Sequence, residues 1–158
     1  MKKLLSIFSV LAVAAMLFAS CSATKSVAYG GSTRSKFVGT WTCNNVTYEG
    51  IVQGTVQSLF DQARPDDFMG SVWKLTNSGN GMYTLNNGVS QSIFWSVNTD
   101  GGNQLFQFKK VYQGDKPKNV AEGYQLVISG ADNNGFTVKV PVSLGNSTGY
   151  VVLTFAKG

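Results

Sequence analysis

The chain contains no histidine, and only two of its 158 residues are cysteines, Cys21 and Cys43. Histidine is the side chain that most often serves as a general base or a metal ligand near neutral pH. Its absence removes the common parts of acyl-transfer and hydrolytic sites, the usual protein ligand of haem and most zinc sites. We therefore expect no enzymatic activity, no catalytic residue, no metal site and no bound cofactor.

Acidic side chains are also scarce, with 8 Asp and Glu against 13 Lys and Arg. They are scattered, and the one adjacent pair, Asp66 and Asp67 after Pro65, is interpreted as part of a solvated loop rather than a metal cage. From Phe37 onward the basic and acidic residues are equal in number, so the excess positive charge lies in the N-terminal part. A formally neutral domain has no net attraction for a phosphate backbone, and we expect no nucleic-acid partner.

The first twenty-one residues follow a pattern typical of export. Lys2 and Lys3 precede an apolar run, Leu4–Ala19, which ends in Ser20-Cys21. This run is shorter than the ~20 residues that span a bilayer, so it predicts a cleaved signal peptide rather than a membrane helix. Phe18-Ala19-Ser20-Cys21 resembles the lipobox of bacterial lipoproteins, in which the cysteine is acylated and becomes the first residue.

That resemblance implies that residues 1–20 are removed and that Cys21 carries the lipid that attaches the protein to the envelope of a Gram-negative bacterium. Ser22 is not the aspartate that resembles an inner-membrane retention signal, so we expect anchoring in the outer membrane. Residues 21–36 are mostly small and polar and contain glycine, which is typical of a flexible tether. The membrane, through the lipid, is therefore the first expected partner.

Cys43 has no disulfide partner within the chain once Cys21 is acylated. Without a histidine to activate it, this thiol is interpreted as a small buried apolar group rather than a reactive site.

After Lys36 the chain breaks into short runs rich in Val, Phe, Tyr and Thr, separated by Gly, Asn and Asp turns. Asp100-Gly101-Gly102 is typical of a tight hairpin, and apolar residues alternate with others over 136–142. The pattern predicts strands at 37–46, 69–76, 81–86, 91–98, 103–112, 122–129, 135–143 and 149–156. Sequential hairpins favour an all-β domain over 37–158, an eight-stranded antiparallel up-and-down barrel whose closure removes open edges.

One segment between the first two expected strands has helical spacing. Over 49–64 the apolar residues fall at 52, 56, 59, 60 and 63, and Pro65 would end a helix. We therefore expect one short helix between strands 1 and 2, covering an end of the barrel. Its apolar residues Val56 and Phe60 would form either a plug that completes the core, the commoner use of such a stripe, or a lid over a cavity.

Phe37-Val38-Gly39-Thr40-Trp41 resembles the Gly-x-Trp signature of the lipocalins and related calycins. Together with the lipobox, Gly39 and Trp41 make the chain similar to bacterial lipocalin-like lipoproteins, in which the tryptophan closes the bottom of the barrel. The META-type domains, another group of small lipoproteins, have similar segments and stay an alternative. No arginine follows Arg64 to pack over the tryptophan, and Lys157 is a poor replacement because it lacks a planar guanidinium. Tyr150 likewise lacks the arginine partner with which fatty-acid-binding relatives hold a carboxylate.

The resemblance implies a barrel that binds a small hydrophobic or amphipathic ligand, and the aromatic content agrees with this. The candidate wall residues are Trp73, Phe94, Trp95, Phe106, Phe108, Tyr124 and Tyr150. Neighbouring strand residues point to opposite faces, so one of Phe94 and Trp95 must point outward, as must one of Leu105 and Phe106. The alternative is a filled barrel that acts as a protein-interaction or inhibitor module of the envelope. A cavity lined by at least two of these aromatic residues would favour the carrier.

Overall fold

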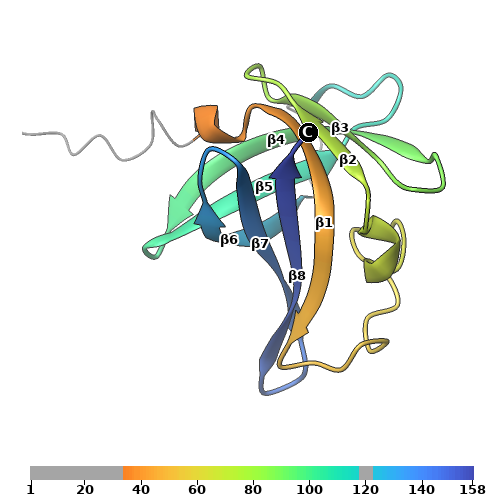
Figure 1. Cartoon of the computed structure of the whole chain (residues 1–158), viewed down its shortest axis with the longest axis vertical. Coiled ribbons are helices and arrows are strands. Elements are labelled where there is room, and N and C mark those ends of the chain that lie inside the picture. The colour runs from red at the N-terminus through yellow and green to blue at the C-terminus, as the bar shows by residue number, and fades with distance from the viewer. Residues whose placement is uncertain (1–33, 118–122) are drawn as a thin grey trace, which may run out of the picture.

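The computed structural model describes residues 34–117 and 123–158, in which eight antiparallel strands close into a barrel (Figure 1). The strands are β1 (Gly39–Glu49), β2 (Val72–Leu75), β3 (Asn80–Thr84), β4 (Ser90–Asp100), β5 (Asn103–Lys110), β6 (Tyr124–Ala131), β7 (Gly135–Ser143) and β8 (Thr148–Lys157). Each strand pairs with the next along the chain, and β8 pairs with β1. The predicted up-and-down barrel is confirmed. The predicted signal peptide, Cys21 and most of the predicted tether lie outside the described residues.

The strands form because buried and outward-facing residues alternate along them. In β4, Ile93 and Trp95 are buried, and the half-buried Phe94 between them points outward. In β5, Phe106 points inward and Leu105 outward, and both of these orientations follow from the register with β4. Gly101 and Gly102, with φ of 54° and 82°, supply the positive φ that the tight turn between these strands requires.

The two ends of the barrel are built differently. At the closed end, the 3-10 helix η1 (Arg34–Phe37) enters the barrel near the C-terminal end of β8 (Figure 1). At the opposite end, called the mouth here, β1 ends and β2 begins. There β7 continues past the last residue pair of its ladder with β6, Val127 and Lys139, and remains paired with β8 alone.

The expected short helix between the first two strands is present as η2 (Pro65–Phe68), a single 3-10 turn. Its position is not the expected one, because no helix forms over 49–64. Pro65 begins η2 instead of ending a helix, since proline fits the first turn, where a backbone donor is dispensable. Residues 50–64, called the mouth segment here, are a folded loop with one isolated bridge, Leu59 to Ala63. Gly50 and Gly54 adopt positive φ there, which a helix excludes.

The folded domain begins earlier than the expected boundary at Phe37. The polar composition of Arg34–Lys36 predicts that they belong to the tether, but they form most of η1. The Arg34 guanidinium lies 5.0 Å from the centre of the Trp95 ring and donates a hydrogen bond of 3.2 Å to the Trp95 carbonyl oxygen. Small polar residues precede this helix, so composition alone gave no sign that the helix packs on the barrel.

Candidate functional site at the mouth of the barrel

The closed end is a dry aromatic core. Phe37 is buried with its ring centre 5.0 Å from that of Phe136, and Trp41 is 5.1 Å from the same ring. The Trp41 indole N–H donates to the Phe37 carbonyl oxygen at 2.8 Å, which satisfies its polar atom inside the core. Gly39 has φ of 145°, a conformation that favours glycine, at the point where the chain passes from η1 into β1. Gly39 and Trp41 thus help to form the closed end.

Cationic side chains cover two tryptophans, Trp41 and Trp95. The Lys157 ammonium lies 5.9 Å from the Trp41 ring, and Arg34 covers Trp95. The expectation that Lys157 is a poor partner rested on its missing guanidinium. The structure places an early arginine on a second tryptophan, a contact that the sequence analysis missed. The one sign of this contact in the sequence is that Arg34 lies three positions before Phe37, the aromatic residue at which the domain was expected to begin.

The middle of the barrel is filled. Trp73, Phe106 and Phe155 line an enclosed void, together with Leu126, Phe136 and Val138, and this void has no room for a water molecule. The Phe136 and Phe155 rings stack at 4.6 Å, and the Trp95 and Phe106 rings at 5.6 Å. In this conformation the enclosed void between these aromatic residues is therefore not the ligand cavity that was expected.

The candidate wall residues divide into two groups. Trp73, Trp95, Phe106 and Phe108 are buried in the interior, and Tyr124 is half-buried at the mouth. The outer surface holds the other two, Phe94 and Tyr150, which therefore do not line the interior.

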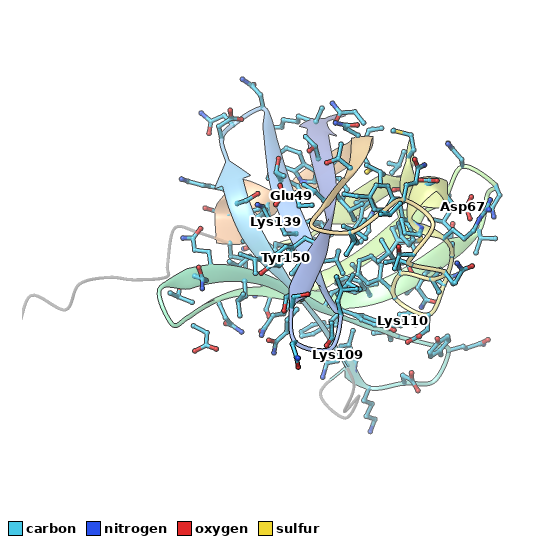
Figure 2. The ribbon with its side chains drawn as sticks, turned by 90° about the horizontal axis from the view of Figure 1, so that it is seen from below. Glu49, Asp67, Lys109, Lys110, Lys139 and Tyr150 are labelled. Atoms are coloured by element: carbon cyan, nitrogen blue, oxygen red, sulfur yellow. The ribbon has the colours of Figure 1, made fainter. Side chains whose placement is uncertain are left out.

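Both outward rings have neighbours on the outer surface. The Phe94 ring lies against Gly79. Tyr150 has the Lys139 ammonium 5.8 Å from its ring, and that ammonium lies 2.6 Å from a carboxylate oxygen of Glu49 (Figure 2).

The Phe60 side chain fills the mouth and packs against the aromatic residues of the filled core. Its side chain is 4 % exposed, and its ring centre lies 4.9 Å from that of Phe108, 5.2 Å from Tyr124 and 5.3 Å from Phe68. Trp73 lies below it at 6.4 Å. The mouth thus contains an aromatic pocket whose occupant is a side chain of the mouth segment rather than of a strand.

The backbone that delivers Phe60 is strained. Phe60 and Asp61 have φ of 55° and 48°, and the Gln62 N–H donates to the Leu59 carbonyl oxygen at 3.0 Å. A tight turn with two successive positive φ values normally contains Asn and Gly. Non-glycine residues held there cost of order 1–3 kcal/mol each. Burying a Phe side chain contributes about 1.5–3 kcal/mol, so burial of the ring offsets only part of the strain of the two residues.

Hydrogen bonds to three strands hold the turn in place. The Asp61 carboxylate accepts from the Tyr124 hydroxyl at 2.8 Å, and the Asp61 carbonyl oxygen accepts from the Lys110 ammonium at 3.2 Å. The Gln62 side-chain oxygen accepts from the Tyr83 hydroxyl at 3.4 Å. Burial, and secondarily the neighbouring tyrosines, raise the pKa of Tyr83 well above its usual value, so its hydroxyl stays a donor.

A second set of contacts joins the mouth segment to β1 and η2. Asp66 accepts hydrogen bonds from the Tyr48 hydroxyl at 2.7 Å and from the Gln53 amide at 3.0 Å. These two bonds lower the pKa of Asp66, because they stabilise its ionised form. Burial, followed by the contact with Asp66, raises the pKa of Tyr48 to about 12. Seen from below, the mouth segment crosses from the Glu49 end of β1 towards Lys110 (Figure 2).

Partly buried apolar side chains of the mouth segment and of β1 and β7 pack against the core. They include Ile51, Val56, Val46, Val140 and Val142. Gly149 gives Ile51 room to approach β8 closely, because a side chain there would collide with it. Phe60 and Val56, the two expected lid residues, thus both lie over apolar surface, with Phe60 the deeper of the two.

Cys43 is fully buried next to the bulge of β1, and burial raises its pKa to about 11. A neutral buried thiol is a weak nucleophile, in line with the interpretation of Cys43 as an apolar group.

In the described ranges, 34–117 and 123–158, no three acidic or cysteine side chains gather so as to hold a metal ion. The same residues form no helix with the length and apolar character needed to cross a membrane. Comparisons with protein-family models, with curated proteins and with solved structures find no match to this chain.

Proposed function

We propose that this protein is a lipid-anchored envelope protein whose lipocalin-like barrel binds a small apolar or amphipathic molecule at the mouth, in the place of Phe60. The observation that carries the proposal is the strained turn that inserts Phe60 among Phe68, Trp73, Phe108 and Tyr124. Strain of this kind gathers at clamps and switches, where it is part of the mechanism. The signal-peptide pattern of residues 1–20 and the lipobox-like Phe18–Cys21 support the envelope location.

The closed form is only moderately favoured over an open one in this proposal. Withdrawing the turn loses about 1.5–3 kcal/mol from burial of Phe60, together with the hydrogen bonds of Asp61 and Gln62, and it relieves strain of order 1–3 kcal/mol at each of Phe60 and Asp61. A ligand that buries similar apolar surface in the vacated pocket shifts the population towards the open form by its differential affinity. Opening requires movement of the mouth segment alone, since η2 and the strands supply the pocket walls.

The filled core limits the size of the ligand. Trp73, Phe106 and Phe155 occupy the barrel below Phe60, so a long acyl chain has no channel to enter. The vacated space is that of one aromatic side chain among Phe68, Trp73, Phe108 and Tyr124. We expect a ring-sized or short branched ligand.

A specific observation favours the second candidate function, a protein-interaction or inhibitor module without a ligand. The enclosed void between Trp73 and Phe155 has no room for a water molecule, as a purely structural barrel requires. In that case Phe60 is a permanent plug, and the protein acts through its outer surface.

Native mass spectrometry of the protein isolated from its own host distinguishes the two. A co-purifying small molecule supports the carrier, and a stable partner protein without a small molecule supports the module.

Calorimetric titration with 3-phenylpropanol, a neutral probe, adds a direct test of the pocket. We expect Phe60→Gly to bind it at least tenfold more tightly than the unaltered protein, because the pocket no longer has to be emptied. Tyr150→Ala is the matched control, since it removes an aromatic ring that lies on the outer surface against Lys139. Equal affinities in the folded Phe60→Gly variant and the unaltered protein would overturn the carrier.

A further inference from the structure

Phe60 and Asp61 together have the chemistry of a small ligand, an aromatic ring followed by a carboxylate. The ring fills the pocket at the mouth, and the carboxylate accepts a hydrogen bond from Tyr124. Tyr124 contacts both parts, with its ring 5.2 Å from the Phe60 ring and its hydroxyl 2.8 Å from the Asp61 carboxylate oxygen. One side chain of the barrel therefore spans the separation between the apolar and the anionic group.

The positively charged ammonium of Lys110 lies at the same place. Its ammonium donates to the Asp61 main-chain carbonyl oxygen at 3.2 Å, a neutral acceptor. Within the described part of the chain no carboxylate pairs with this ammonium. Charge-assisted hydrogen bonds are roughly twice as strong as neutral ones, so a carboxylate would be a better partner for Lys110 than this carbonyl.

We propose that the mouth binds short aryl or cycloalkyl carboxylates, and that Phe60–Asp61 is a built-in mimic of this ligand. This inference rests on the proposed function, since it requires that the plug can leave the pocket. The ligand ring takes the place of Phe60 against Phe108 and Tyr124. Its carboxylate takes the place of Asp61 at the Tyr124 hydroxyl and, unlike the Asp61 carboxylate, also meets the Lys110 ammonium.

From the sequence, a bound carboxylate is expected to lack a partner, because Tyr150 has no internal arginine beside it. Tyr150 lies on the outer surface, and the partners at the mouth are instead Tyr124 and Lys110 from β6 and β5. The polar head would therefore stay at the rim of the barrel, where it keeps part of its hydration, and only the ring would enter. This arrangement avoids the cost of burying a charge in the core.

The test compares 3-phenylpropionate with its neutral analogue 3-phenylpropanol, by isothermal titration calorimetry of the full-length protein in a non-denaturing detergent. We expect the Phe60→Gly variant to prefer the carboxylate by about tenfold, the effect of roughly one charge-assisted hydrogen bond. Adding Lys110→Met should weaken binding of the carboxylate about five- to tenfold and leave binding of the alcohol unchanged. Lys74→Met is the matched control, because Lys74 is exposed on the outer side of β2, opposite Thr40 and Met82, and should alter neither affinity.

A second variant tests the mimicry with the Phe60 side chain retained. Asp61→Asn keeps a residue that tolerates positive φ and removes the charge that competes for Tyr124, so the carboxylate should bind more tightly.

The outcomes separate the two proposals. If neither compound binds to the Phe60→Gly variant, the mouth is not a ligand site and the proposed function fails. If both bind equally and Lys110→Met changes nothing, the mouth site remains but the assignment to carboxylates is wrong.

Discussion

The closed end and the mouth of this barrel bury aromatic rings to a similar degree, yet they hold them in different ways. At the closed end, Phe37 from η1 and Trp41 and Phe136 from the strands pack together, and the indole of Trp41 finds a backbone acceptor. At the mouth, Phe60 is delivered by a strained loop and held by hydrogen bonds from side chains. Proteins open locally where few regular contacts hold a segment. We therefore expect the closed end to contribute most to the stability of the fold, and the mouth segment to open more readily.

The largest effect is expected from Trp41→Ala at the closed end. Removing a fully buried indole from a rigid aromatic cluster should lower the free energy of unfolding by about 3–5 kcal/mol, because the neighbouring strands cannot collapse into the space. Urea unfolding followed by circular dichroism measures this. A loss smaller than that caused by any truncation of Phe60 would remove the distinction between the two ends.

At the mouth, Phe60→Gly should cost less than Phe60→Ala, by about 1 kcal/mol, although both remove the same ring. Glycine adopts the positive φ of this turn freely, whereas alanine keeps most of the strain. We expect net losses of about 1–3 kcal/mol for the glycine variant, since relief of strain partly offsets the lost burial. Urea unfolding of the two variants measures the difference, and the opposite order would mean that the turn is not strained in solution.

The contact between Tyr48 and Asp66 should make the mouth, but not the closed end, sensitive to acid. The pKa of Asp66 is lowered in the folded protein, so its contribution is present above its usual value of 3.8 and is lost as the pH falls through the folded value. Protection of the mouth segment from hydrogen exchange, corrected for the intrinsic pH dependence of exchange, should therefore fall as the pH drops below about 3.8, before protection of the closed end does. Tyr48→Phe should raise the pKa of Asp66 and abolish the difference. An equal loss of protection at both ends would contradict it.

The smallest expected effect is that of Lys157→Met at the closed end. Its ammonium lies over the Trp41 ring near the chain end, and a cation–π contact at such a site contributes about 0.5–1 kcal/mol. Thermal unfolding should show a shift of a few degrees at most. A shift as large as that of Trp41→Ala would mean that Lys157, like the late arginine of the lipocalins, is essential for closing the barrel.

The strands of this barrel were predictable because each has a local signature, such as the alternation in β7 and the Asp100-Gly101-Gly102 turn. The mouth segment was not predictable in the same way. Its apolar residues have helical spacing, but the loop points Val56, Leu59 and Phe60 at the barrel through turns rather than through a helix. Positive φ at Phe60 and Asp61 is unfavourable locally and arises because the barrel supplies a pocket. No local pattern contains that information.

The direction of adjacent aromatic side chains shows the same division. The alternation of a strand requires one of Phe94 and Trp95 to face outward. Trp95 faces inward, where its ring stacks on Phe106 and is covered by Arg34, and these contacts exist only in the folded barrel. Tyr150 was open to either face, and it lies outside because Val151 fills the interior next to it.

The chain enters the barrel through η1, at the end opposite the mouth (Figure 1). With a lipid on Cys21, the anchor would therefore join the barrel at its closed end and leave the rim around Phe60 unobstructed. A molecule could then reach that rim from solution without passing the attachment point.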